Sequence, residues 1–169
     1  MKTAGFDVDP RSGTSIDGIL VVNPRDFVER RKSVERQLQP LGLPYEFIHS
    51  FDVCDIDDAL VSRYFQSGQL SPGQQSCALK HVQALRLIVE RDWRQALVLE
   101  DDALLVPRFV PELAGTLEEA GRLPSPRVLF IGSGGNQYTP RRLRVAGQRL
   151  YKSERGRLGE AYEIGRAHV

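Results

Sequence analysis

Three adjacent carboxylates, Glu100, Asp101 and Asp102, follow the apolar run 96–99. Like charges this close repel one another unless a cation neutralises them, and carboxylate oxygens are ligands that Mg²⁺ and Mn²⁺ prefer. In an extended segment Glu100 and Asp102 point to one side and Asp101 to the other, so one pair could hold the ion. Mg²⁺ held in this way usually also binds substrate phosphates, which predicts a site for a nucleotide diphosphate. The alternative interpretation is a solvated acidic turn that caps the next helix.

Other polar residues near apolar segments are weaker candidates for a binding site. His81 lies one helical turn after Cys77 on an apolar face, which favours a buried, hydrogen-bonded histidine over a ligand or base. Asn23 ends an apolar run and favours a turn. Arg30 lies in a charged run that favours a solvated helix face, although an arginine there could reach a phosphate. The glycine-rich segment 132–135 lacks the Lys-Ser/Thr of a P-loop and favours a loose turn.

The composition is typical of a globular domain. The chain has 169 residues, 41% hydrophobic and 27% charged, far from disordered or coiled-coil compositions. Its 23 Lys and Arg and 22 Asp and Glu leave a net charge of +1, so global charge gives no argument for nucleic acid or an anionic membrane. No window approaches the ~18 apolar residues of a membrane span, and no apolar leader opens the chain. A cytoplasmic location is therefore expected, with at most peripheral membrane contact.

Short apolar runs alternate with helical patterns. Residues 19–22, 96–99 and 128–131 are typical of strands buried on both faces. Asp26 is expected to cap the first helix. The alternation predicts an α/β fold on a mainly parallel sheet, in which ligands bind at the carboxyl ends of the strands. Asn23, the acidic triplet and the glycine-rich segment all fall at such ends.

The clearest helix signal lies in the middle of the chain. Ser71 as the cap, Pro72 at the first position and Gln74 at the third predict a helix that runs to about Arg91. Its apolar residues cover most of the circumference, which predicts a helix packed between other layers. Cys77 and the other cysteine, Cys54, are too few for a disulfide framework and are expected to be reduced.

Three sequence blocks together point to a known family. Residues 19–23, followed by Glu29-Arg30-Arg31 and the strand entry 41–47, form the first block. Residues 70–81 read LSPGQQSCALKH, and residues 96–102 read ALVLEDD. In this order and at these separations the blocks resemble glycosyltransferase family 25, the lipopolysaccharide-biosynthesis galactosyltransferases related to the procollagen galactosyltransferases. The resemblance covers roughly residues 19–162.

The resemblance implies a GT-A-like, Rossmann-like nucleotide-diphospho-sugar transferase fold, with a mainly parallel sheet flanked by helices and incomplete at the C-terminus. It implies a hexosyltransferase that inverts configuration and transfers galactose from UDP-galactose to lipopolysaccharide or another cell-envelope saccharide, free or lipid-linked. Nucleic acid is not an expected partner. The catalytic residue stays unassigned, because a carboxylate base is expected beyond the end of this chain.

By position, the resemblance also implies roles for individual residues. A Mn²⁺ or Mg²⁺ ion would bridge the donor diphosphate to Glu100, Asp101 and Asp102. The donor itself would be bound by Asn23, Arg30, Cys77, His81 and Asp101. The chain departs from the family pattern at Pro24, usually Leu, at Ser76, usually Gly, and at Lys80, usually Ser. Ser76 and Lys80 are expected to flank the helix face that approaches the donor.

The expected organisation has three parts. Residues 1–17 are expected to form a flexible arm, residues 18–163 the donor-binding portion of the family domain, and residues 164–169 a non-native tail. The tail reads back as ATC-GGA-AGA-GCA-CAC-GTC, a common sequencing adapter, so His168 is left out of the site. Two alternatives to a transferase remain: an inactive nucleotide-sugar-binding fragment, and a receiver-like signalling domain. The latter is disfavoured because run 128–131 ends in Gly132 rather than a phosphoacceptor Asp.

Overall fold

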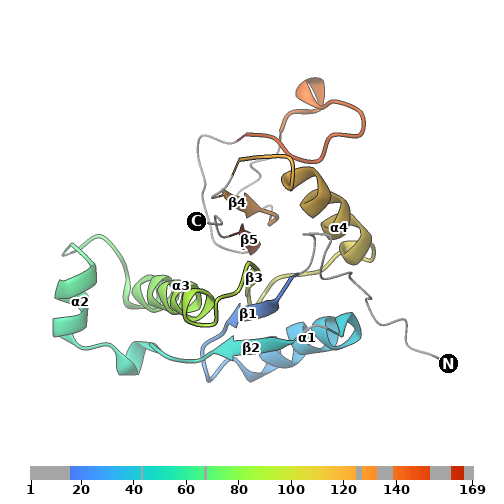
Figure 1. Cartoon of the computed structure of the whole chain (residues 1–169). Helices are drawn as coiled ribbons and strands as arrows, with labels where there is room; N and C mark the ends of the chain where they lie inside the picture. Colours follow the sequence, from blue (N-terminus) through green and yellow to red (C-terminus); the bar gives the residue numbers. More distant parts are fainter. Residues whose placement is uncertain are drawn as a thin grey trace.

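The computed structural model describes residues 16–42, 44–66, 68–124, 127–132, 139–152 and 161–165. It has a five-stranded sheet with helices on both faces (Figure 1). The strands are β1 (Gly18–Val22), β2 (Tyr45–Ile48), β3 (Gln95–Glu100), β4 (Arg127–Phe130) and β5 (Ala161–Gly165). The α-helices are α1 (Val28–Leu38), α2 (Asp58–Tyr64), α3 (Pro72–Glu90) and α4 (Phe109–Ala120). The 3₁₀ turns are η1 (Gln39–Leu41), η2 (Val53–Asp55) and η4 (Arg141–Leu143).

The strand order is β2-β1-β3-β5-β4. Strand β1 pairs in parallel with β2 and β3, whereas β5 runs antiparallel to both β3 and β4. Among the described strands, β1, β2, β3 and β4 therefore run in one direction and β5 runs against them, which confirms the predicted mainly parallel α/β sheet. With its one antiparallel strand, the sheet is consistent with a Rossmann-like glycosyltransferase fold. A receiver domain has an all-parallel sheet of order 2-1-3-4-5, so the antiparallel β5 argues against the signalling alternative.

The two faces of the sheet have separate cores, because alternate residues of a strand point to opposite faces. On one face Ile19, Val21, Leu97 and Leu99 pack with buried residues of α1 and α4. On the other face the intervening strand residues pack with Ala84 and Ile88 of α3 and with Tyr162 of β5; these strand residues are Leu20, Val22, Ala96 and Val98. Each fully buried Leu or Val side chain contributes roughly 1.5–3 kcal/mol, so β1 and β3 anchor both layers.

The helix starts differ in how well the sequence predicts them. At α3 the Ser71 side chain accepts from the Gln74 N–H and the Gln74 side chain accepts from the Ser71 N–H, as predicted. At α1 the prediction of an Asp26 cap is wrong. The Phe27 N–H donates to the Pro24 carbonyl oxygen at 3.0 Å, so Asp26 lies within a turn and the helix begins at Val28 without a side-chain cap.

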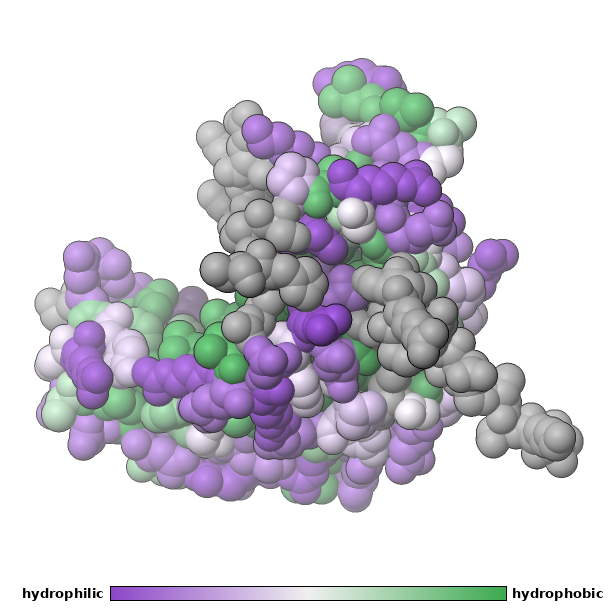
Figure 2. Space-filling view, in the orientation of Figure 1, coloured by the Kyte–Doolittle hydropathy of each residue, from purple (hydrophilic) through white to green (hydrophobic). Residues whose placement is uncertain are grey.

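The prediction that α3 is an interior helix is also wrong. Its buried residues are Ser76, Leu79, Lys80, Ala84 and Ile88, whereas Val89 is 63% exposed and Leu85 37% exposed. The helix therefore covers one face of the sheet and presents apolar side chains to solvent. Figure 2 shows hydrophilic side chains predominating on the face in view, with apolar side chains in smaller groups among them. No helix in the described part of the chain is long and apolar enough to cross a membrane.

Residues at both predicted boundaries of the domain belong to the fold. Ile16 and Asp17, expected in the arm, are part of the fold: Ile16 belongs to the core, and an Asp17 carboxylate oxygen accepts from the N–H groups of Arg94 and Gln95. Residues 1–15 lie outside the described residues. Ile164 and Gly165, expected in the tail, continue β5. Residues 166–169 lie outside the described part, and the non-native origin of the tail stays a prediction.

Gly18 at the start of β1 is required by close packing. A Cβ atom built there would lie 2.3 Å from the ring of Trp93, closer than real Cβ contacts allow. Trp93 precedes β3, and its ring packs against the α3 side of the core. The smallest residue therefore lets β1 pair with β3 in the register that aligns Gly18 with Ala96 and Val22 with Glu100.

A buried ion pair fixes the loop that follows β2. Lys80 of α3 is 1% exposed, and its Nζ lies 2.7 Å from an Asp52 carboxylate oxygen and 2.8 Å from the Ser50 carbonyl oxygen. The Ser76 hydroxyl donates to the carbonyl oxygen of Phe51 at 2.6 Å. Phe51 has a φ of 64°, a backbone conformation that costs energy for a residue with a side chain. Ser76 and Lys80 thus hold a strained loop, and this contact differs from the predicted role beside the donor.

Replacement of Lys80 is expected to destabilise the chain. Burial alone would raise the pKa of Asp52, but hydrogen bonds from Lys80 and the Arg25 N–H hold it below its ordinary value, so the carboxylate is buried as an anion. Lys80→Met leaves that charge poorly compensated and is expected to lower the free energy of unfolding by about 3 kcal/mol in urea titrations. Lys32→Met, which breaks an exposed pair with Glu29, should cost less than about 0.5 kcal/mol. Equal losses in the two variants would contradict this account.

A second buried carboxylate predicts a pH dependence of stability. Glu163 of β5 is fully buried, and neither carboxylate oxygen has a hydrogen-bond partner among the described residues. Burial raises its pKa to about 7, although the charge of Arg127 acts in the opposite direction. Because the folded-state pKa exceeds the unfolded one, the contribution of Glu163 to the free energy of unfolding is greatest below pH ~4.5 and is lost as the pH rises to about 7.

Glu163→Gln is expected to remove this pH dependence. The shift corresponds to about 3 kcal/mol at pH 8, so the variant should gain stability over the natural chain at pH 8 and little at pH 4. Urea unfolding at a series of pH values measures the difference. Glu118→Gln, at an exposed carboxylate of α4, serves as the control. If Glu163→Gln retained the slope of the natural chain, Glu163 would not be the titrating group.

Candidate active site

The carboxyl ends of β1 and β3 bring Asn23 and the acidic segment together. Because Val22 pairs with Glu100, the residues that follow, Asn23 and Asp101, come side by side. The Asn23 Nδ2 donates to a carboxylate oxygen of Asp101 at 2.8 Å. Both residues are buried, with 0% and 6% exposure. The amide oxygen Oδ1 of Asn23 has no partner among the described residues, so the site contains an unused buried acceptor.

Arg30 of α1 lies between the two aspartates of the acidic segment. Its Nη1 is 3.3 Å from Asp101 Oδ1 and 3.3 Å from Asp102 Oδ2. Arg30 and Asp102 are each about half exposed, whereas Asp101 is buried. The guanidinium also lies 5.1 Å from the centre of the Phe27 ring. One half-exposed cationic group therefore already lies between the two carboxylates.

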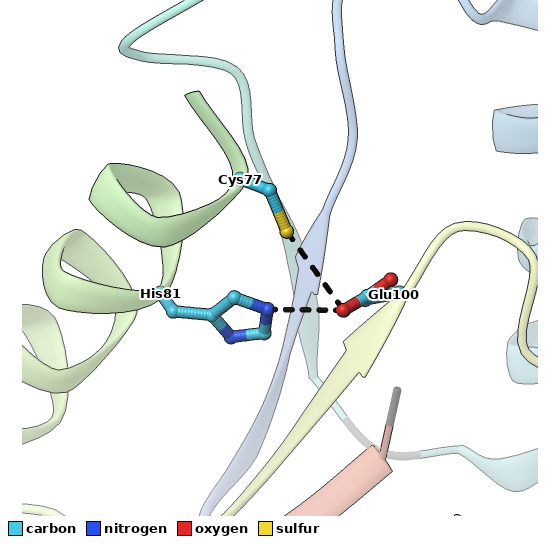
Figure 3. Close-up of side chains that lie close together, drawn as sticks. All are labelled: Cys77, His81 and Glu100. Atoms are coloured by element: carbon cyan, nitrogen blue, oxygen red, sulfur yellow. Dashed lines mark hydrogen bonds and ion pairs between the residues drawn. The ribbon is translucent and has the colours of Figure 1, made fainter. Parts of the chain in front are cut away.

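Glu100 belongs to a different cluster (Figure 3). Its Oε1 lies 3.3 Å from His81 Nε2 and 3.8 Å from the Cys77 sulfur, both on α3. The predicted alternation, with Glu100 and Asp102 on one side, does not hold. Strand β3 ends at Glu100 and Asp101 and Asp102 form a turn, so these two converge on Arg30 while Glu100 contacts α3.

Burial controls the protonation of two groups beside Glu100. It raises the pKa of the Cys77 thiol to about 11, with a further contribution from the negative charge of Glu100. It likewise raises the pKa of Tyr162, whose hydroxyl lies 3.1 Å from His81 Nδ1. At neutral pH both groups therefore keep their protons. His81 is held between Tyr162 and Glu100, more polar surroundings than the apolar face that its spacing indicated.

A pocket of about 470 Å³ opens on the other side of the acidic turn. Its lining includes Asp102, the apolar residues of segment 103–106, Phe109 at the start of α4, and Ile131 and Gly132 after β4. The exposed carboxylate of Asp102 thus faces both Arg30 and a space large enough for a small ligand. The rest of the glycine-rich segment, residues 133–135, lies outside the described residues.

The predicted site residues therefore form two adjoining groups. Asn23, Arg30, Asp101 and Asp102 come together in one, and Cys77, His81 and Glu100 in the other. The sequence did not indicate Tyr162, because it lies 81 residues after His81 along the chain. It also did not indicate His49, whose Nδ1 lies 3.1 Å from the Asn23 carbonyl oxygen. Only the pairing of distant strands brings either residue to the site.

The sequence also matches a known protein family. Residues 16–127 match the model of the family described as glycosyltransferase family 25 (LPS biosynthesis protein). The match includes β1, α1, α3 and β3, which either carry the predicted site residues or directly precede them.

Three insect proteins are similar to the chain, and each is named a glycosyltransferase 25 family member. The protein of Aedes aegypti is 27% identical over 134 residues, covering 73% of this chain and 22% of its own length. Those of Anopheles gambiae and Drosophila melanogaster are 25% and 23% identical, covering 73% and 72% of this chain and 23% and 22% of their own lengths. The chain thus spans about a fifth of the length of these relatives. Since the family model matches more than half of the residues, the chain belongs to glycosyltransferase family 25.

Proposed function

We propose that the chain is the donor-binding part of a glycosyltransferase that moves a hexose, galactose from UDP-galactose, onto lipopolysaccharide or another cell-envelope saccharide. The observation that carries this proposal is the group formed by Asn23, Asp101, Asp102 and Arg30 at the carboxyl edge of a sheet in a family 25 chain. Ligands of open α/β sheets bind at this edge. Acidic and basic side chains are both present there, as a metal-bound diphosphate requires.

A divalent cation fits between Asp101 and Asp102. Both are carboxylates, the hard oxygen ligands that suit Mg²⁺ and Mn²⁺, and the Nη1 atom of Arg30 now lies near one oxygen of each. Asp102 is half exposed and can accept the ion, whereas Asp101 is oriented by Asn23. When bound, the cation supplies charge that stabilises a departing diphosphate. Glu100 could join these ligands only by leaving Cys77 and His81.

The chain's own residues would contribute binding and orientation. Arg30 is exposed and carries the planar guanidinium that pairs with phosphate oxygens. The amide oxygen of Asn23 has no partner among the described residues but is buried, so it would accept a hydrogen bond from the nucleoside only if the side chain turned outward. No described residue is proposed as the base that deprotonates the acceptor hydroxyl. Because the chain spans about a fifth of its relatives, donor binding without turnover is the second candidate function.

Loss of the Asp102 carboxylate is expected to weaken metal-dependent donor binding. Calorimetric titration of UDP-galactose in the presence of Mn²⁺ should show at least about 10-fold weaker binding for Asp102→Asn, since an interaction with charged groups is worth about 1.5–3 kcal/mol. Addition of a chelator should weaken binding to the natural chain by a similar factor.

The matched control is Asp58→Asn, at an exposed carboxylate in the first turn of α2. This variant should bind UDP-galactose as the natural chain does. The proposal fails if Asp102→Asn keeps the affinity of the natural chain, or if the folded natural chain binds UDP-galactose equally with and without Mn²⁺.

A further inference from the structure

Cys77, His81 and Glu100 place three different metal-ligating atoms around one point (Figure 3). The cysteine sulfur, one histidine nitrogen and one carboxylate oxygen all lie within 4.8 Å of one another. Cys77 and His81 lie one turn apart on α3, so they share a helix face. Glu100 reaches them from the last position of β3.

The distances suit a tetrahedral ion. With metal–ligand bonds of about 2.0–2.3 Å, neighbouring ligand atoms of a tetrahedral site lie roughly 3.3–3.6 Å apart. Here the His81 Nε2 and Glu100 Oε1 are 3.3 Å apart, and the Cys77 sulfur is 3.8 Å from the same oxygen. Two of the three ligand-atom distances are therefore close to those of a tetrahedral site, and the third, between the sulfur and the histidine nitrogen, is within 4.8 Å.

The surroundings support ligation through His81 Nε2. A ligating histidine usually donates its other ring N–H to a nearby polar group, which fixes the ring. The Tyr162 hydroxyl occupies that position, 3.1 Å from Nδ1. The His81 and Glu100 side chains are 16% and 25% exposed, so an ion can enter from solvent while the site remains partly shielded.

We propose that Cys77, His81 and Glu100 bind a borderline-soft divalent ion of the Zn²⁺ class, separate from the hard cation proposed at Asp101 and Asp102. Sulfur and imidazole ligands select Zn²⁺ over Mg²⁺. On binding, the Cys77 thiol gives its proton to solvent and the sulfur forms the metal bond. Thiolate and carboxylate together balance the double positive charge. Three protein ligands leave the fourth position for water or a substrate oxygen.

Such an ion would fix the start of the acidic turn. Glu100 immediately precedes Asp101, and the ion would tie the end of β3 to α3 just where the chain turns toward Arg30. The inference does not depend on the proposed sugar donor, because it concerns ligands on the opposite side of β3.

Cobalt binding tests the site directly. Co²⁺ occupies zinc sites, and a Co²⁺–thiolate bond gives a charge-transfer absorption that oxygen and nitrogen ligands do not. The metal-free reduced full chain, titrated with Co²⁺, should develop this band and lose it when Zn²⁺ is added. Cys77→Ser should abolish the band, whereas Cys54→Ser, at an exposed thiol, should retain it. Urea unfolding of each variant confirms that it is folded.

Two more variants separate the possible outcomes. Tyr162→Phe should retain the band with roughly 10-fold weaker binding, the usual effect of losing an outer partner. Asp102→Asn should retain the band at unchanged Co²⁺ affinity, even where donor binding is lost, so the two proposals can fail separately. The inference is overturned if the natural chain gives no band, if folded Cys77→Ser keeps it, or if Cys54→Ser removes it.

Discussion

The buried hydrogen bond from Asn23 to Asp101 is the constraint on which the rest of the site depends. It joins the ends of β1 and β3 at 2.8 Å, and it provides a donor to a carboxylate that is almost fully removed from solvent. An ionised carboxylate buried without such partners is costly, so the backbone at Asp101 has little freedom. With Asp101 held toward β1, Glu100 contacts α3 and Asp102 is left exposed beside Arg30. The three adjacent carboxylates thus fall into two groups, Asp101 and Asp102 beside Arg30 and Glu100 beside α3.

These environments have different chemistry. Asp101 and Asp102 share the half-exposed guanidinium of Arg30, and Asp102 also lines the pocket. This arrangement is suited to exchange of Arg30 for a metal-bound diphosphate. Glu100 lies with a thiol and an imidazole, softer ligands that suit a different ion. The acidic segment therefore contributes ligands to two candidate sites. The parallel pairing of β1 with β3 sets the position of this segment.

Local sequence patterns predicted much of the fold, because strands and caps depend on neighbouring residues. The apolar runs at β1 and β3 are strands as expected, and the capping box at Ser71 and Gln74 is present. The Asp26 cap failed because a turn beginning at Pro24 delays the helix. The alternation of the acidic triplet failed because the strand ends at Glu100. In both cases a change in backbone conformation, which the residue types do not specify, decided the outcome.

The roles of Lys80 and Tyr162 could not be predicted in the same way. A lysine on an apolar helix face indicates a partner, but Asp52 becomes that partner only through the strained loop after β2. Tyr162 reaches His81 only because β5 inserts antiparallel between β3 and β4. Both contacts depend on sheet topology, which a single sequence constrains weakly. The candidate residues themselves were largely identifiable, whereas their division into two groups required the structure.

Paramagnetic broadening of amide signals is the most direct test of the central claim that the acidic turn binds a metal–diphosphate. An isotopically labelled chain would be titrated with a trace of Mn²⁺ in the presence and absence of UDP, with Mg²⁺ as the diamagnetic control. The account predicts broadening that UDP strengthens and that is greatest at Asp101 and Asp102, next to Asn23. The account would be contradicted by broadening that does not change when UDP is added, or by broadening that is greatest at a distant segment such as η4.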